Sequence, residues 1–215
     1  MIALLNPNTS ALTTAAMLRI ARTEAGPHMA IEGFTAPFGA ELITTPEALD
    51  RAGDAVRAMR PDIAQARAVV IAAFGDPGLD DLRATLDVPV TGIAEAGMAE
   101  AAAGGRRFAV VTTTPALRDR IAATAARHGH DGFIGTWTTP GDPARLTADP
   151  ATLRAALKEG CFWAAKNGAE AIIIGGGPLA EAAKALAGTV PTPLIEPLPA
   201  AIRLTLTRLA NGVPG

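Results

Sequence analysis

Residues 172–180, IIIGGGPLA, constrain the fold of this chain more than any other stretch. Three isoleucines lead directly into Gly175, Gly176 and Gly177, and Pro178 and a helix-like stretch follow. An apolar run that stops at glycine is typical of a buried parallel strand that ends in a tight turn. Ligands of open α/β sheets bind beyond such strand ends, where glycine lets them approach the backbone and its N–H groups. The turn is therefore our first candidate for a wall of a binding site.

An earlier copy of this pattern lies in the first half of the chain. Residues 69–79, VVIAAFGDPGL, are again an apolar run that ends in small residues. Two further pairs of stretches match in the same order, 2–10 with 108–116 and 87–93 with 189–196, at offsets of about 103 to 106 residues. Such ordered similarity indicates an internal duplication. We therefore expect an N-terminal lobe of residues 1–97 plus about 197–215, a C-terminal lobe of residues 98–196, and a site in the cleft between them.

Strand-like and helix-like stretches alternate along both halves. The strands at 68–73 and 172–174 are too apolar to be half exposed, which favours parallel sheets covered by helices on both faces. The predicted fold class is α/β, with two similar lobes related by a pseudo-twofold axis. Residues 35–45 and 140–148 are predicted to be loops, and a loop as long as 35–45 is often functional.

The composition excludes several classes of function. Hydrophobic residues make up 49% of the 215, the formal charge is −2 and the pI is about 5.9, so nucleic acid is not an expected partner. Cys161 is the only cysteine and the three histidines lack ligand spacing, so we expect neither disulfides nor a metal site. Neither a signal peptide nor a membrane span is evident. We expect a cytoplasmic protein that acts on a small molecule.

Polar side chains follow the first strand of each half. Asn6 and Asn8 follow residues 2–5, and Thr112, Thr113 and Thr114 hold the equivalent place in the second half. These residues have two interpretations. Their amides and hydroxyls either bind a ligand carbonyl or carboxylate at the cleft, or form local turns.

Asp76 and Glu196 are the candidates for proton transfer. Both follow strands, so either is a candidate general acid or base at the cleft. Asp76 also fits a helix cap or an Asx turn, and Glu196 fits the first turn of a helix. Cys161 lies in a predicted helix beside aromatic residues and no base, which indicates a buried, unreactive thiol.

Together these motifs resemble the aspartate/glutamate racemase superfamily, most closely its hydantoin racemase branch. The resemblance rests on NPNTS at 6–10, FGDPGL at 74–79, VTT at 111–113 and the triple glycine turn, with Val-Pro segments near Val88 and Val190. It implies two α/β lobes with the site between them, no cofactor, and assembly into homo-oligomers. The site residues that it implies are Asn6, Asn8, Ala73, Phe74, Gly75, Thr112, Thr113, Thr114, Gly175, Gly176, Gly177 and Pro178.

The chain departs from the family at two decisive positions. The family's chemistry uses two cysteines, one at each twin turn, to remove a proton and return it on the opposite face of a planar intermediate. Ala73 and Gly176 stand in these places, and neither can transfer a proton. Cys161 is far from both motifs. Either the cysteines were replaced by mutation, or the chain belongs to a natural cysteine-free branch with altered chemistry, and we favour the second interpretation.

The sequence leaves two main hypotheses for function. The first is a cofactor-independent enzyme that acts through an enolate or oxyanion on a hydantoin-like cyclic imide or an amino-acid-derived carboxylate, with Asp76 or Glu196 as acid or base. Racemisation, ring-opening hydrolysis, elimination and decarboxylation share such an intermediate. The second is a non-catalytic binding protein that keeps the ligand pocket. A phosphate or nucleotide binder is disfavoured, because neither GxGxxG nor Walker A spacing is present.

Overall fold

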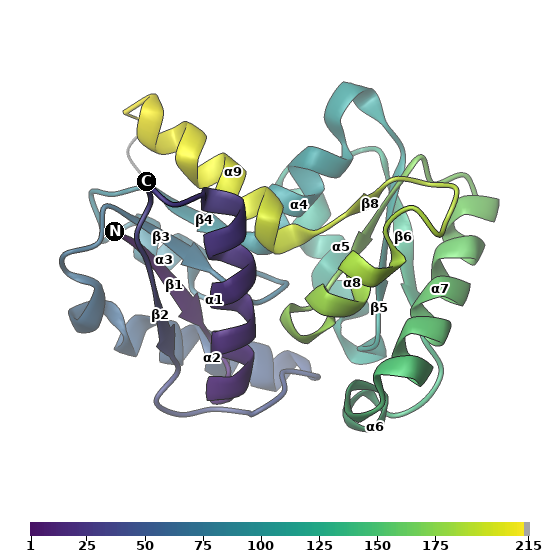
Figure 1. Ribbon diagram of the computed structural model, residues 1–215, viewed down its shortest axis with the longest axis horizontal. Coiled ribbons are helices and arrows are strands. Elements are labelled where there is room, and N and C mark those ends of the chain that lie inside the picture. Colours follow the sequence, from purple (N-terminus) through teal and green to yellow (C-terminus); the bar gives the residue numbers. More distant parts are fainter. Residues whose placement is uncertain (213–215) are drawn as a thin grey trace.

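The chain forms two parallel four-stranded sheets with the same strand order (Figure 1). The computed structural model describes residues 1–212, apart from the side chain of Pro178. The first sheet has the order β2-β1-β3-β4 and consists of β1 (Ile2–Asn6), β2 (Ile31–Thr35), β3 (Ala68–Ile71) and β4 (Val90–Gly92). The second has the order β6-β5-β7-β8 and consists of β5 (Phe108–Thr112), β6 (Phe133–Thr138), β7 (Ala171–Ile174) and β8 (Leu194–Ile195). The predicted α/β class is confirmed, and the repeated order agrees with an internal duplication.

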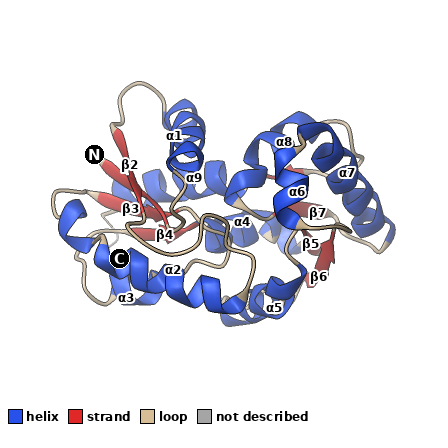
Figure 2. Cartoon of the chain, turned by 90° about the horizontal axis from the view of Figure 1, so that it is seen from below, coloured by secondary structure: helices blue, strands red, loops and turns tan. Residues whose placement is uncertain are grey.

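Helices cover both faces of each sheet (Figure 2). The helices are α1 (Ala11–Ala25), α2 (Pro46–Ala58), α3 (Leu79–Arg83), α4 (Ile93–Ala101), α5 (Arg118–Arg127), α6 (Pro143–Ala148), α7 (Pro150–Lys166), α8 (Ala180–Leu186) and α9 (Pro197–Ala210). Short 3-10 turns, which include η3 (Pro115–Leu117) and η4 (Gly177–Leu179), join some of these elements. Within residues 1–212, no helix has both the length and the apolar character needed to cross a membrane.

Alternating strand residues enter different cores. In β1, Ile2 and Leu4 lie in a central core, whereas Ala3 and Leu5 pack with residues of α2 and α3 on the other face. The central core also holds Phe108 of β5, and residues of α1, α4, α5 and α9 complete it. It therefore runs from one sheet to the other and fixes the two halves against each other.

The C-terminal helix α9 returns to the first half of the molecule. It packs against α1 and α4 and reaches β3 and β4 (Figure 1). Arg208 of α9 donates to the carboxylate of Glu95 in α4 and to the carbonyl oxygen of Val90 in β4. The predicted lobe boundaries at 97/98 and 196/197 stay predictions. They assign α9 to the N-terminal lobe, and α9 does contact elements of that lobe.

One stretch differs from the prediction. Residues 140–148 were expected to form a loop, but they contain α6. Asp142 caps this helix by accepting a hydrogen bond from Arg145 N at 3.0 Å, and Pro143 occupies its first turn. Both are helix start signals. A helix of six residues is too short to show the hydrophobic periodicity on which the prediction depended.

Candidate functional site

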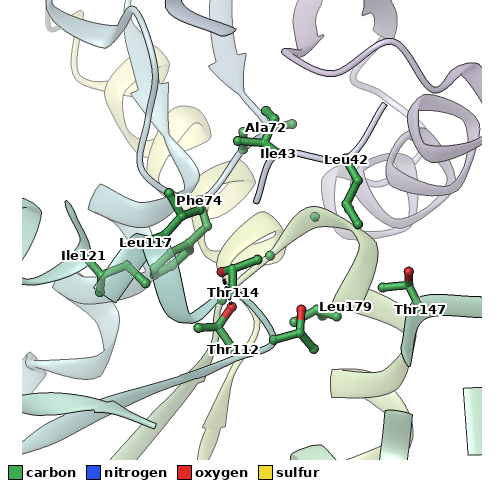
Figure 3. A pocket seen from close by; sticks show the side chains of 15 residues that line it. Leu42, Ile43, Ala72, Phe74, Thr112, Thr114, Leu117, Ile121, Thr147 and Leu179 are labelled. Atoms are coloured by element: carbon green, nitrogen blue, oxygen red, sulfur yellow. Dashed lines mark hydrogen bonds between the residues drawn. The ribbon is translucent and has the colours of Figure 1, made fainter. Parts of the chain in front are cut away.

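A small cavity lies between the two halves, beyond the carboxyl ends of β3, β5 and β7. Its volume is about 50 Å³. Both halves line it, with Ala72, Ala73 and Phe74 after β3, Thr112, Thr113 and Thr114 at the end of β5, and Gly175, Gly176 and Gly177 after β7. Leu42, Ile43, Leu117, Ile121, Thr147 and Leu179 complete the wall. Figure 3 shows Leu42, Ile43 and Ala72 on one side and Thr112, Thr114 and Leu179 on the other. The predicted position of the site, at strand ends between two similar halves, therefore coincides with a cavity.

The twin turns touch each other directly at this cavity. A side-chain carbon on Gly175 would lie 3.0 Å from the ring atoms Cδ1 and Cε1 of Phe74. A side-chain carbon on Gly177 would lie 3.3 Å from the carbonyl oxygen of Ala72. Such distances are tighter than most carbon contacts, so a side chain at either position would force its neighbours to shift by a few tenths of an ångström. Close approach by a ligand is therefore not the only reason for the glycine run.

Gly176 carries a different restriction. Its φ is +145°, a conformation that residues with a side chain rarely adopt, and an added Cβ would lie 3.2 Å from Cγ and Cδ1 of Leu179. Ala73, across the cavity, has no positive φ. The backbone at residue 176 therefore adopts a conformation that favours glycine. That the turn is naturally free of cysteine stays a prediction.

Hydroxyl groups supply the polar side chains of the cavity wall. The hydroxyls of Thr112 and Thr114 lie 3.1 Å apart and bond to each other. Thr113 is 3% exposed, and no hydrogen bond among the described residues involves its hydroxyl. Among the described residues, no acceptor receives a hydrogen bond from the backbone N–H groups of Gly176 and Gly177. These groups are available to a ligand that carries carbonyl oxygens.

No lining residue of the cavity has a side chain that titrates near neutral pH. Within residues 1–212, no cluster of three or more His, Cys, Asp or Glu side chains is arranged to hold a metal ion. The cavity can therefore bind and polarise a small molecule, but its wall offers no side-chain proton acceptor.

Comparison with known proteins identifies the family of the chain. The family described as Asp/Glu/hydantoin racemase matches residues 2–205. The chain belongs to the Asp/Glu/hydantoin racemase family. It is 28% identical to a hydantoin racemase of Paenarthrobacter aurescens, over 98% of this chain and 92% of the relative. Among solved structures, an allantoin racemase from Pseudomonas fluorescens superimposes with a TM-score of 0.93 at 26% identity, over 99% and 92% of the two chains. An allantoin racemase from Klebsiella pneumoniae gives 0.90 at 29% identity, over 99% and 89%.

In this racemase-family chain, Asp76 holds the start of a helix and does not line the cavity. Its carboxylate accepts hydrogen bonds from Ala94 N at 2.8 Å and Glu95 N at 2.7 Å, at the first turn of α4. Asp76 is the only described non-glycine residue with a positive φ, at 51°. Burial raises the pKa of Asp76 to about 7, and the two backbone hydrogen bonds oppose that rise. The contacts show a helix cap, but of α4 and not of α3, the helix that directly follows Asp76. A part for Asp76 in proton transfer stays a prediction.

Glu95 joins this cap to the C-terminal helix. Its largely buried carboxylate forms ion pairs with Arg83 at 2.8 Å and with Arg208 at 2.7 Å, and it accepts a hydrogen bond from Gly92 N. Burial alone would raise the pKa of Glu95, but the hydrogen bonds and charges of Arg208 and Arg83 outweigh it, so the pKa lies below its usual value. Hydrogen bonds and ion pairs of Asp76, Glu95 and Arg208 thus link the turn after β3 with α4 and α9.

Four other predicted residues also lie away from the cavity wall. Asn6 donates to Asn8 Oδ1 at 2.8 Å and to Thr14 Oγ1 at 2.9 Å, so the two amides hold the turn after β1. Glu196 is the cap residue before α9, and burial raises its pKa. Gly75, of the first turn, faces Leu49 of α2. A part for these residues in binding stays a prediction. The side chain of Pro178 lies outside the described residues.

Cys161 is buried in α7, where burial raises the pKa of its thiol to about 12. It packs in the outer core of the second sheet and does not line the cavity. The prediction of an unreactive thiol agrees with this environment.

The prediction missed the apolar part of the wall. Leu42 and Ile43 belong to the 35–45 loop, whose length was its only signal. Thr147 belongs to α6, which was predicted to be a loop. Leu42, Thr147 and Gly177 also line a wider groove of about 640 Å³ between α1 and the α6–α8 region. The groove therefore adjoins the cavity.

Proposed function

We propose that this racemase-family protein binds a small hydantoin-like ring in the cavity and does not racemise it by proton transfer between side chains. The observation that carries the proposal is the cavity wall, which supplies threonine hydroxyls and backbone N–H groups but no titratable side chain. Relatives named hydantoin and allantoin racemases support the class of ligand. Ala73 and Gly176, at the positions that we assign to the family's cysteines, line the same cavity.

The wall is chemically suited to a planar cyclic imide. Such a ring carries carbonyl oxygens, which the hydroxyl of Thr113 and the N–H groups of Gly176 and Gly177 can meet as donors. Phe74, Leu117 and Leu179 offer apolar surface to the ring. A ring substituent would extend past Leu42 and Thr147 into the wider groove.

The absence of a titratable side chain from the cavity wall limits the rate of C5 proton exchange that we expect. A positioned general base contributes about 10²–10⁴ to such a proton transfer. The cavity wall retains hydrogen-bond donors, but polarisation of a carbonyl accelerates the transfer only when a base within reach takes up the proton. We therefore expect the C5 proton of a bound hydantoin to exchange within about tenfold of the rate without protein.

Calorimetry with a 5-substituted hydantoin tests the binding. Thr113→Val keeps the shape of the side chain and removes the hydroxyl, so it should weaken binding about five- to tenfold. Thr207→Val, on the exposed face of α9, is the matched control and should bind as the wild type does. Equal affinity in all three proteins would show that the ligand binds elsewhere. The absence of any heat of binding in the wild type would contradict the proposal.

The second candidate function is catalysis on the bound ring, with the carboxylate of Asp76 or Glu196 as acid or base. Burial raises the pKa values of Asp76 and Glu196, and such shifts are common at catalytic sites. Asp76 would have to release the N–H groups of Ala94 and Glu95 to act. Proton exchange or ring opening that is lost in Asp76→Asn or Glu196→Gln would favour this candidate.

A further inference from the structure

The cavity between the halves is too small for the ring that we propose it binds. Its volume is about 50 Å³. A cavity of about 150 Å³ is known to hold benzene, and a hydantoin ring with its two carbonyl oxygens is no smaller. Much of the wall is formed by buried residues, which include Phe74, Thr112 and Leu179. Part of the wall must therefore move before the ring can enter.

The strand-end segments of the wall are firmly held. Ala72 N donates to Leu5 O at 2.8 Å, and Gly175 N donates to Val111 O at 2.9 Å. The ring of Phe74 lies directly against Gly175. Movement of these segments would break backbone hydrogen bonds and the contact between the two halves.

Residues 41–44 form a wall segment that is held less firmly. Among the described residues, none of these four takes part in a hydrogen bond. The nearest anchors on either side are the hydrogen bond from Thr9 N to Ala40 O, at 3.1 Å, and the cap that the hydroxyl of Thr45 provides to α2. A segment without hydrogen bonds of its own can be displaced at a low cost in free energy.

Leu42, in this segment, lies at the boundary between the cavity and the wider groove of about 640 Å³. It lines both spaces, together with Thr147 and Gly177. Thr147 is part of α6, and its hydroxyl donates to Pro143 O at 3.0 Å. Leu42 projects from its loop toward the side of the cavity that carries Thr147 and Leu179 (Figure 3). The side chain of Leu42 is therefore the least constrained part of this boundary.

The packing of the segment indicates which side chain can leave. Within residues 1–212, Leu42 belongs to none of the three hydrophobic cores, whereas its neighbour Ile43 packs against the central core. Leu12, on the wall of the groove, is 86% exposed, so the groove is open to solvent. Displacement of Leu42 would thus join the cavity to an open groove while Ile43 stays in place.

We propose that Leu42 is the gate of the cavity, whose side chain separates the cavity from the groove and swings aside to admit a hydantoin-like ring. This inference rests on the proposed function of the cavity. A gate controls passage in both directions, so its removal accelerates entry and exit of the ligand alike. A residue that only contacts the bound ligand changes mainly the rate of exit.

Line-shape analysis of NMR titrations with 5-methylhydantoin gives both rate constants and tests the gate. Leu42→Ala should raise the association and dissociation rate constants about tenfold each, so that the dissociation constant stays within about threefold of the wild type. Leu42→Trp fills the boundary and should lower the association rate constant about tenfold or more. Leu12→Ala changes the groove away from the boundary, and both rate constants should stay within about twofold of the wild type.

The outcomes distinguish the gate from the proposed function. Binding with rate constants that Leu42→Ala leaves unchanged would overturn the gate alone. Weaker binding of Leu42→Ala through faster dissociation only would also overturn the gate, because it would show a simple contact. No binding to the wild type or to any variant would contradict the proposed function, and the gate with it. Circular dichroism checks that each variant keeps the fold.

Discussion

The ring of Phe74 lies directly against the backbone of Gly175, so that a side-chain carbon on Gly175 would be 3.0 Å from two atoms of that ring. Phe74 belongs to the turn after β3, and Gly175 to the turn after β7. The two halves of the molecule thus meet at the same turns that line the cavity. The contact both closes the cavity and fixes which residues can stand in its wall.

Gly175→Ala should destabilise the protein by about 1–3 kcal/mol, because the added methyl group overpacks a closed contact. Removal of the ring relieves that clash, so Phe74→Ala and Gly175→Ala should cost less together than the sum of their separate effects. Urea unfolding of the two single variants and the double variant measures this coupling. Additive costs would contradict the contact.

Glu95→Ala should cost about 2–3 kcal/mol of unfolding free energy. The change leaves Arg83 and Arg208 partly buried without their shared partner and removes a hydrogen bond at the start of α4. Arg203→Ala breaks exposed pairs with Glu24 and Glu100 and is the control, with an expected cost below about 1 kcal/mol. Similar costs in both variants would show that the Glu95 network does not hold α9.

Asp76 should make stability fall as pH rises. Burial raises its pKa to about 7 in the folded protein, whereas an unfolded aspartate titrates near about 4. Its contribution is therefore complete below about pH 4 and is lost as the pH rises to about 7, at up to about 1.4 kcal/mol per pH unit. Asp76→Asn should flatten this slope, and Asp131→Asn, which is exposed, should not. A slope that is unchanged in Asp76→Asn would contradict the assignment.

Ala73→Cys should place a proton acceptor in a cavity that has none. We expect C5 proton exchange of a bound hydantoin to rise about 10²-fold or more at pH 8–9, where the thiolate is populated. Ala210→Cys, exposed at the end of α9, is the control for a thiol elsewhere on the protein. No acceleration would mean that residue 73 does not face the ligand.

Addition of Gly176→Cys to Ala73→Cys should lower stability by about 1–3 kcal/mol. A cysteine at residue 176 must either keep a φ of +145° or move the turn, and its Cβ would crowd Leu179. Thermal unfolding of the single and double variants measures the cost. A double variant as stable as Ala73→Cys would show that the turn accepts a side chain without strain.

The fold was predictable from the sequence because its strongest signals are local. Residues 172–174 and 69–71 are apolar runs that end at small residues, and both form central, buried strands. The repeat of these runs at a nearly constant offset anticipated two similar halves with parallel sheets, and the structure shows that the two sheets also share one strand order. α6 was missed because one short turn of helix carries little periodic signal.

The site was predictable in part. The strand ends identified the threonines after β5 and the glycines after β7, and the family resemblance added Ala73 and Phe74. All of these residues line the cavity. The direction of a side chain beyond a strand end depends on distant partners, and the sequence does not show these. Asp76 is turned toward α4 by N–H groups that lie 18 and 19 residues further along the chain. Leu42 reaches the cavity from a loop with no motif of its own.

The central claim is that the cavity binds a hydantoin-like ring without abstracting its C5 proton. Proton NMR of one enantiomer of a 5-substituted hydantoin in D₂O, with and without the protein, tests both parts in one sample. The account predicts ligand signals that broaden or shift with protein, while the C5 signal decays within about tenfold of the protein-free rate. Faster loss of that signal, new open-chain signals, or a ligand spectrum that the protein leaves unchanged would contradict it.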